Sequence, residues 1–282
     1  MTLELKAMNE THLDAAFALT QRLKWPHRRA DWQQALLLGD GLVAEEDGAL
    51  VGTILFWRWG KEYATLGLVI VDDAQQGRGI GKQLMQAALA KLEGSNVRLH
   101  ATAAGQPLYE KLGFVATGHV EQHQCRELAA VPAIPCGPQQ RIRSAGAQDA
   151  AMLTALDRQA HGQHRPLLIT HLLDSAERFV VLEENGTAAG FASLRRFGHG
   201  YAIGPVVASN LANARLLVSE LLSGMSGQFV RLDTDRSAGL GPWLNELGLV
   251  EVDAPTTMVK GQPWQLESGG MQAFGLMSQA MA

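Results

Sequence analysis

The sequence predicts a mixed α/β fold made of two similar domains. Apolar runs of strand length alternate with amphipathic runs of helix length along the chain. Several short patterns of the first half recur in the second half at a nearly constant offset. A proline-rich segment separates the two copies. With 282 residues, the chain is long enough to bury two hydrophobic cores.

The first copy follows the order strand, two helices, hairpin, strand, helix, strand, helix, strand. We expect the hairpin turn at Asp47-Gly48, because both residue types tolerate positive φ angles. The expected ranges are Leu3–Ala7, His12–Lys24, Arg29–Leu38, Leu42–Trp57, Tyr63–Val71, Gly79–Leu92, Asn96–Thr102, Gln106–Leu112 and Phe114–His119.

The repeat is clearest at the hairpin. The run Leu42–Gly48 matches the run Val180–Gly186 at an offset of 138 residues. Three further matches follow in the same order, and they pair His27-Arg28 with His164-Arg165, Gly67 with Gly204, and Leu112–Val115 with Leu247–Val250. Chance similarity would not hold nearly one offset over four places, so we infer a duplicated fold.

The domain boundary is expected at the prolines. Pro132, Pro135 and Pro138 exclude a helix interior or a central strand. We therefore predict a first domain at 1–128, a linker at 129–140 and a second domain at 141–282. Apolar residues at near-helical spacing in the tail, Met271–Met277, are expected to pack on a domain surface or on a second subunit.

Composition excludes several classes of protein. A hydrophobic share of 46% and a charged share of 18% are typical of a soluble globular protein. The net charge of -4 gives no electrostatic reason to expect a nucleic acid partner. Neither a signal peptide nor a membrane span is visible, so we expect a cytoplasmic protein. We expect it to be a monomer or a homodimer. Cys125 and Cys136 lack metal-ligand spacing, and no metal is expected.

A glycine cluster between a buried strand and an amphipathic helix predicts an anion site. Gly77, Gly79 and Gly81 follow the strand Leu66–Val71 and carry no side chains that would shield their amides. The start of a helix adds unpaired N–H groups and a favourable dipole for a phosphate. Arg78 and Lys82 add positive charge.

Two common phosphate-binding folds fit this cluster poorly. A dinucleotide-binding fold would place the glycines after the first strand of a βαβ unit, whereas here they follow the fourth strand. A P-loop would need Ser or Thr directly after Lys82, where Gln83 stands.

The cluster resembles the GNAT acetyltransferase superfamily. Gln76, Gly79 and Gly81 fit its pattern of Gln or Arg, two residues, Gly, one residue, and Gly or Ala. The segment from Tyr109 to Phe114 is similar to its Tyr-x-x-x-Gly-Phe motif. The resemblance implies two tandem GNAT-like domains, each with a central mixed, mostly antiparallel sheet flanked by helices.

The resemblance also implies acetyl-CoA as cosubstrate. The fourth strand would hold the pantetheine arm, and its N–H groups would hold the oxyanion that forms on the thioester carbonyl. Tyr109 would act as catalytic residue and donate a proton to the leaving CoA thiolate. The full predicted cosubstrate set is Val69, Ile70, Val71, Gln76, Gly77, Arg78, Gly79, Ile80, Gly81, Lys82, Thr102 and Tyr109.

The second copy has lost these features. Gly79 and Gly81 map to Leu216 and Val218, whose side chains would cover the amides, and Tyr109 maps to Leu244. We therefore expect a degenerate GNAT-like domain that binds no acetyl-CoA. It would pack on the first domain, either to line the acceptor pocket or as a purely structural partner.

The acceptor site is less defined. Candidate substrate residues are Trp25, His27, Arg28, His164 and Arg165, with Asp233 and Asp235 as acidic alternatives. Candidate bases for the amine proton are His100, His119, Asp72, Asp73 and Glu62, or a chain of waters.

The predicted reaction is transfer of the acetyl group to a primary amine of a small molecule, by direct attack through a tetrahedral intermediate. One alternative is acetylation of a protein lysine or N-terminus. Another is a non-catalytic sensor that binds acyl-CoA. Tyr109 and the intact glycine cluster favour catalysis.

Overall fold

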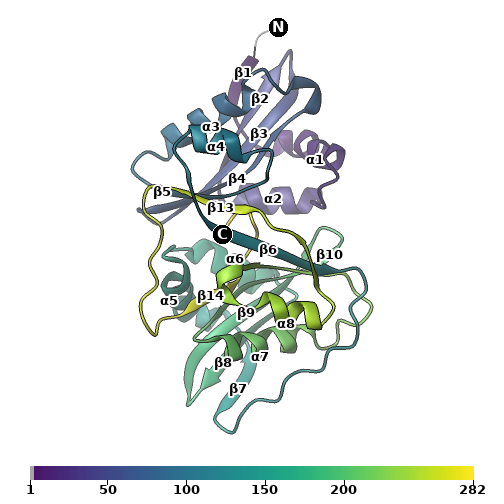
Figure 1. The fold of residues 1–282 in the computed structure, drawn as a ribbon, viewed down its shortest axis with the longest axis vertical. Helices are drawn as coiled ribbons and strands as arrows, with labels where there is room; N and C mark the ends of the chain where they lie inside the picture. The colour runs from purple at the N-terminus through teal and green to yellow at the C-terminus, as the bar shows by residue number, and fades with distance from the viewer. Residues whose placement is uncertain (1–2) are drawn as a thin grey trace.

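The computed structural model describes residues 3–282, which form two similar halves along the long axis of the molecule (Figure 1). The first half contains β1 (Leu3–Ala7), α1 (Leu13–Arg22), α2 (Arg29–Leu38), β2 (Asp40–Glu46), β3 (Ala49–Trp59), β4 (Tyr63–Val71), α3 (Ile80–Lys91), β5 (Asn96–Ala101), α4 (Gln106–Lys111) and β6 (Val115–Cys125). The second half contains β7 (Gln140–Ser144), α5 (Ala150–His161), α6 (Pro166–Ser175), β8 (Arg178–Glu184), β9 (Thr187–Phe197), β10 (Gly200–Ala208), α7 (Leu211–Leu222), β11 (Val230–Asp235), α8 (Gly241–Glu246), β12 (Val250–Asp253), β13 (Thr256–Lys260) and β14 (Gln272–Gly275). Helices flank a mixed, mostly antiparallel sheet in both halves, which confirms the predicted fold class.

The hairpin that revealed the repeat has the same turn in both halves. Asp47 and Gly48 join β2 to β3 with φ angles of 50° and 79°. Asn185 and Gly186 join β8 to β9 with φ angles of 53° and 76°. Two successive residues with positive φ match the right-handed twist of the flanking strands, which is why Asp-Gly and Asn-Gly pairs occur at this turn.

The long strand β6 belongs to both sheets. Its first part pairs with β13, and its second part, Val120–Cys125, lies between β11 and β12. In return β13, from the second half of the chain, lies between β5 and β6 of the first sheet. Each half therefore completes its sheet with a strand from the other half.

This exchange changes the predicted domain ranges. Residues 126–139 carry no helix or strand and join β6 to β7. The ranges 1–128 and 141–282 nevertheless do not coincide with the two sheets, because Val120–Cys125 and Thr256–Lys260 cross from one to the other.

The tail packs on the second half as a strand and not as a helix, although the apolar residues of Met271–Met277 have near-helical spacing. Its strand β14 pairs antiparallel with Val206–Ala208 of β10. The neighbouring strand β11 pairs with β10 only over Tyr201–Ile203. β14 therefore fills the space that opens where β10 and β11 diverge.

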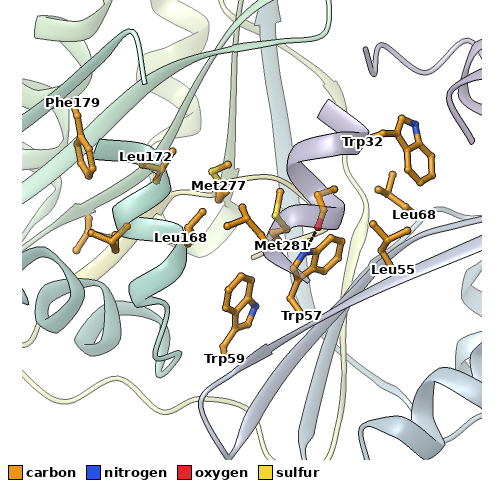
Figure 2. Packing of buried hydrophobic residues seen from close by; sticks show 14 of the residues in the cluster. Trp32, Leu55, Trp57, Trp59, Leu68, Leu168, Leu172, Phe179, Met277 and Met281 are labelled. Atoms are coloured by element: carbon orange, nitrogen blue, oxygen red, sulfur yellow. Dashed lines mark hydrogen bonds between the residues drawn. The ribbon is translucent and has the colours of Figure 1, made fainter. Parts of the chain in front are cut away.

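The largest core joins the two halves. Trp57 and Trp59 of β3 pack with Leu168 of α6 and with Met277 and Met281 of the tail, as Figure 2 shows. The helices α1 and α2 lie on this face of the first sheet, whereas α3 and α4 cover the opposite face with a separate core. No helix within residues 3–282 is long and apolar enough to cross a membrane.

Candidate functional site

The strands β4 and β5 diverge at the centre of the first sheet. They pair in parallel only over Tyr63–Thr65, and no pairing between them continues beyond Thr65. A bulge follows in β4, where Leu68 has a φ angle of 51° and the register with β3 shifts. The backbone of β4 past Thr65 therefore borders a gap, called here the β4–β5 opening.

Two amides of β4 face this opening. The Asp72 N–H donates to Val51 O of β3 at 2.9 Å. Because successive residues of a strand point their N–H groups to opposite sides, Ile70 also faces β3, whereas Val69 and Val71 face away from it. The predicted place of Ile70 among the oxyanion donors is therefore wrong: its amide belongs to the ladder with Thr53.

The glycine loop, Gln76–Lys82, forms an open turn at the start of α3. Gly77 and Gly79 have φ angles of 78° and 77°, and a Cβ atom built on either one would contact nothing within 4 Å. The first α-helical bond runs from Gln83 N to Gly79 O. The N–H groups of Ile80, Gly81 and Lys82 precede it and have no partner inside the helix. This geometry suits a phosphate group.

The charges of the loop are unequal. The Arg78 guanidinium pairs with both carboxylate oxygens of Glu46, at 2.7 and 2.8 Å, and this pairing lowers the pKa of Glu46. The Gln76 side chain donates to Asp73 at 2.8 Å. Lys82 is exposed and forms no ion pair within the described residues, which leaves its charge available to an anion.

Tyr109 lies on α4, on the α3 side of the sheet. Its ring is buried, stacks edge-on against Phe114 and lies beside Gly105, where an added Cβ would come within 3.4 Å of the hydroxyl. Burial raises the pKa of Tyr109 to about 12, so the phenol keeps its proton at neutral pH. The Thr102 hydroxyl accepts a hydrogen bond from Gly105 N at 3.2 Å, which places Thr102 between β5 and the Tyr109 helix.

The equivalent region of the second half is closed. The Asn210 side chain caps α7 by accepting from Asn213 N at 2.9 Å, and Leu216 and Val218 are buried in the core. The opening between β10 and β11 holds β14, and a Cβ on Gly204 would overlap the carbonyl oxygen of Leu276. In the second half β14 therefore fills the opening that corresponds to the β4–β5 opening of the first half.

A cavity of about 470 Å³ lies between the two halves. Gly67, Leu68, His100 and Thr102 form its wall at the β4–β5 opening. The facing wall comes from the second half, and the segment Lys24–His27 and the tail close the sides. The cavity therefore meets the opening from the face opposite α3.

Only two of the five predicted substrate residues line this cavity. Trp25 and His27 do. Arg28 instead pairs with Asp31, and His164 is exposed beside Gly60. Arg165 is fully buried.

The predicted substrate role of Arg165 is wrong for a physical reason. Its guanidinium forms two bonds to the buried Asp157 carboxylate, at 2.6 and 2.7 Å, and lies over the ring of Trp59. The position matches Arg28 in the repeat, but on the second half it lies in the core between the halves.

One of the five base candidates lines the cavity. His100 Nδ1 bonds to Gln279 O at 2.7 Å, so Nδ1 carries the hydrogen and Nε2 the lone pair, because a carbonyl oxygen only accepts. Desolvation and the nearby Arg98 charge lower the pKa of His100 to about 4. Asp72 pairs with Arg22, Asp73 accepts from Gln76, and His119 and Glu62 lie outside the cavity lining.

The facing wall holds residues that sequence reasoning missed. Arg195 and Arg231 reach the cavity from β9 and β11, together with Phe197 of β9 and Gln122 of β6. Asp233, considered as an acidic alternative, also lines the cavity, whereas Asp235 does not. These residues are scattered along the chain, and only the strand register brings them together.

One cluster has the composition of a metal site. Glu121, His123 and Glu251 place one ligand atom each within 4.8 Å of one another. Arg236 already pairs with both carboxylates, at 2.8 and 3.0 Å, and His123 Nδ1 bonds to Leu249 O. Arg236 therefore balances part of the carboxylate charge, and none of the three residues lines the cavity.

Comparisons with known proteins identify the family of the chain. Residues 38–116 and residues 153–272 each match a model described as an acetyltransferase (GNAT) domain. The chain is 27% identical over 286 residues to the uncharacterized N-acetyltransferase YitH of Bacillus subtilis strain 168, covering 99% of this chain and 98% of that protein. It is 24% identical over 238 residues to the holothin acyltransferase of Pseudoalteromonas sp. strain SANK 73390, covering 83% and 78%.

The fold agrees as well. A protein from Pyrococcus horikoshii assigned as an acetyltransferase superposes with a TM-score of 0.79 at 19% identity, over 99% of this chain and 96% of that one. The chain therefore belongs to the GNAT acetyltransferase family and carries two GNAT domains in tandem.

Proposed function

We propose that the chain transfers an acetyl group from acetyl-CoA to a primary amine of a small molecule. One observation carries the proposal: the cavity between the halves ends at the β4–β5 opening, where Gly67, Leu68 and Thr102 border both. Acetyl-CoA would enter from the α3 side with its phosphates at the glycine loop. Its thioester would then reach the cavity between Leu68 and Thr102. The second half binds no acetyl-CoA in this proposal and supplies one wall of the cavity.

The groups at the opening suit acyl transfer. The amine nitrogen attacks the thioester carbon, the N–C bond forms and the C–S bond breaks. The Val69 and Val71 amides are available to the carbonyl oxygen as negative charge develops on it. The Tyr109 phenol gives its proton to the departing sulfur, and the proton lost by the amine nitrogen restores the phenol through solvent.

His100 orients the amine in this scheme. Its Nε2 lone pair accepts a hydrogen bond from the amine N–H, because Nδ1 already donates to Gln279 O. The lowered pKa keeps the ring neutral at neutral pH, so it does not repel the incoming amine.

The shape of the cavity favours a small acceptor over a protein. A volume of about 470 Å³ lies in the range of small-molecule sites. The second half and the tail cover the face of the first sheet on which an extended peptide would lie. A protein that only binds acyl-CoA as a sensor would not need this cavity at the thioester end of the β4–β5 opening.

The test is a panel of primary amines with detection of released thiol, for the native chain and for Tyr109→Phe. We expect turnover with a subset of amines and a loss of about 10²- to 10⁴-fold in kcat for Tyr109→Phe, the usual contribution of a general acid. Acetyl-CoA affinity, measured by calorimetry, should stay within about twofold. Tyr63→Phe is the matched control, since Tyr63 packs against Trp264 away from the cavity.

Two results would overturn the proposal. Full turnover by Tyr109→Phe at every pH would remove its role as proton donor. Tight acetyl-CoA binding without turnover on any amine would make the chain a sensor.

A further inference from the structure

We infer that the acceptor is an amino carboxylate, whose carboxylate pairs with Arg195 on the second-half wall of the cavity. This inference rests on the proposed function, because it describes the second substrate of the same site. It uses residues that neither the glycine loop nor Tyr109 involves.

Strand register places two arginines in one row on this wall. Ala202 of β10 pairs with Arg195 of β9 on one side and with Arg231 of β11 on the other. All three line the cavity. Both guanidinium groups lie over the ring of Phe197, at 5.3 and 5.5 Å from its centre. The small Ala202 side chain between them leaves room for a ligand group.

The two arginines differ in their partners. Arg231 forms two bonds to the Asp233 carboxylate, at 2.9 and 2.7 Å, so its charge is already balanced. Arg195 forms no ion pair with any carboxylate of residues 3–282. Its one hydrogen bond goes to Met277 O, and its buried Nε has no partner among these residues.

The carboxylates nearest to Arg195 are occupied. Asp31 accepts from the Arg28 side chain and from Gly198 N, and Asp233 is held by Arg231. Arg195 is only 5% exposed. Desolvation lowers its pKa to about 10, so it remains charged at neutral pH. A buried charge without a partner is costly, and a ligand carboxylate would remove that cost.

The charge of the whole lining fits one negative charge on the ligand. Lys24, Arg195 and Arg231 line the cavity against Asp233 and Asp253, which leaves one positive charge. The histidines do not add to it, since burial lowers the pKa of both His27 and His100 to about 4. A monoanionic carboxylate balances this lining, whereas a phosphate dianion would exceed it.

The two ends of the cavity also suit the two groups of such a substrate. Arg195 lies on the second-half wall, and His100 lies on the first-half wall beside the β4–β5 opening. A substrate carboxylate bound to Arg195 would direct the substrate amine toward His100. Trp25 and Phe197 offer apolar surface to the part of the molecule in between.

The experiment compares amino carboxylates with their carboxamides, which have the same shape and no charge. For the native chain we expect kcat/KM to favour the carboxylate by about 10- to 150-fold, the range for a hydrogen bond to a charged group. Arg195→Gln should lose this preference through KM, with acetyl-CoA affinity unchanged. Arg196→Gln is the matched control, because the neighbouring Arg196 is exposed and pairs with Glu177.

A second measurement does not depend on turnover. Simple carboxylic acids without an amine should raise the melting temperature of the native chain and of Arg196→Gln, but not of Arg195→Gln or Arg195→Met. Arg195→Met keeps the length of the side chain and removes a buried charge, so it should fold even if Arg195→Gln does not. If the thermal shift is seen but no acetyl transfer is detected, the proposed function is wrong and the carboxylate site stands.

Three results would overturn the inference. They are equal kcat/KM for carboxylate and carboxamide, a preference that survives in Arg195→Gln, and selection of an amine with a phosphate group over the carboxylate.

Discussion

Replacement of Gly79 by alanine tests the glycine loop directly. Gly79 has a φ angle of 77° and open space around its Cβ position, so alanine meets no clash but carries the cost of left-handed backbone, about 1–2 kcal/mol. A shift of φ toward negative values would relieve part of this cost and would rotate the amides at the start of α3. Loss of one amide bond to a phosphate, worth about 1.5–3 kcal/mol, corresponds to a rise of about 10- to 150-fold in the Kd for acetyl-CoA.

Gly186→Ala supplies the control for backbone strain. Gly186 has a φ angle of 76° and equally open surroundings, but it lies in the β8–β9 turn of the second half. Both variants should lose similar stability in urea unfolding, and only Gly79→Ala should lose affinity in calorimetry with acetyl-CoA. Equal affinities for the two variants would show that the loop does not hold the phosphates.

Two further predictions concern the core and the pH dependence. Asp157→Ala leaves the buried Arg165 without its carboxylate partner, so the free energy of unfolding measured in urea should fall by about 3–5 kcal/mol. The double variant Asp157→Leu/Arg165→Met should recover much of this loss. A loss below about 1 kcal/mol in Asp157→Ala would contradict the stabilising role of the pair. The pKa values of His27 and His100 are lowered to about 4 and that of Tyr109 is raised to about 12, so none of these groups changes charge between about pH 5.5 and 9. The acceptor amine, with an ordinary pKa near 10.4, loses its proton as pH rises, so kcat/KM should rise about tenfold per pH unit over this range. An inflection near pH 6.5 would instead indicate a catalytic histidine with an unperturbed pKa.

Local patterns were sufficient for most elements of the first half. The strand Tyr63–Val71, the helix Arg29–Leu38 and the hairpin turn at Asp47-Gly48 follow from apolar periodicity and turn chemistry, which act over neighbouring residues. The strand exchange depends on pairing between distant segments. Nothing near Thr256–Lys260 in the sequence indicates that these residues fill the first sheet, because the vacancy beside β5 exists only in three dimensions.

The same distinction between local patterns and distant pairing applies to the residues of the site. The glycine loop is contiguous, so its sequence carried the expectation of a phosphate group. In the sequence Arg195 stands next to Arg196, and two adjacent arginines suggest an exposed surface. Because side chains alternate along β9, Arg195 points inward beside Ala202. Arg165 shows the opposite error, because a match in the repeat gives an equivalent position in the fold and says nothing of distance to the cavity.

The tail of the chain contacts both openings: it fills the one between β10 and β11 and lines the cavity at the β4–β5 opening. β14 occupies the opening between β10 and β11, which leaves no space there for a ligand. Leu216 and Val218, at the positions of Gly79 and Gly81, pack in the core of the second half. Beyond β14 the chain crosses to the first half, where Ala280 packs on Gly67 and Gln279 O holds the His100 ring. The segment that closes the second opening thus forms a wall of the cavity at the first. If β14 did not fill the opening of the second half, the segment that follows it would not be held at the first, which gives a physical reason why only one of the two openings is free.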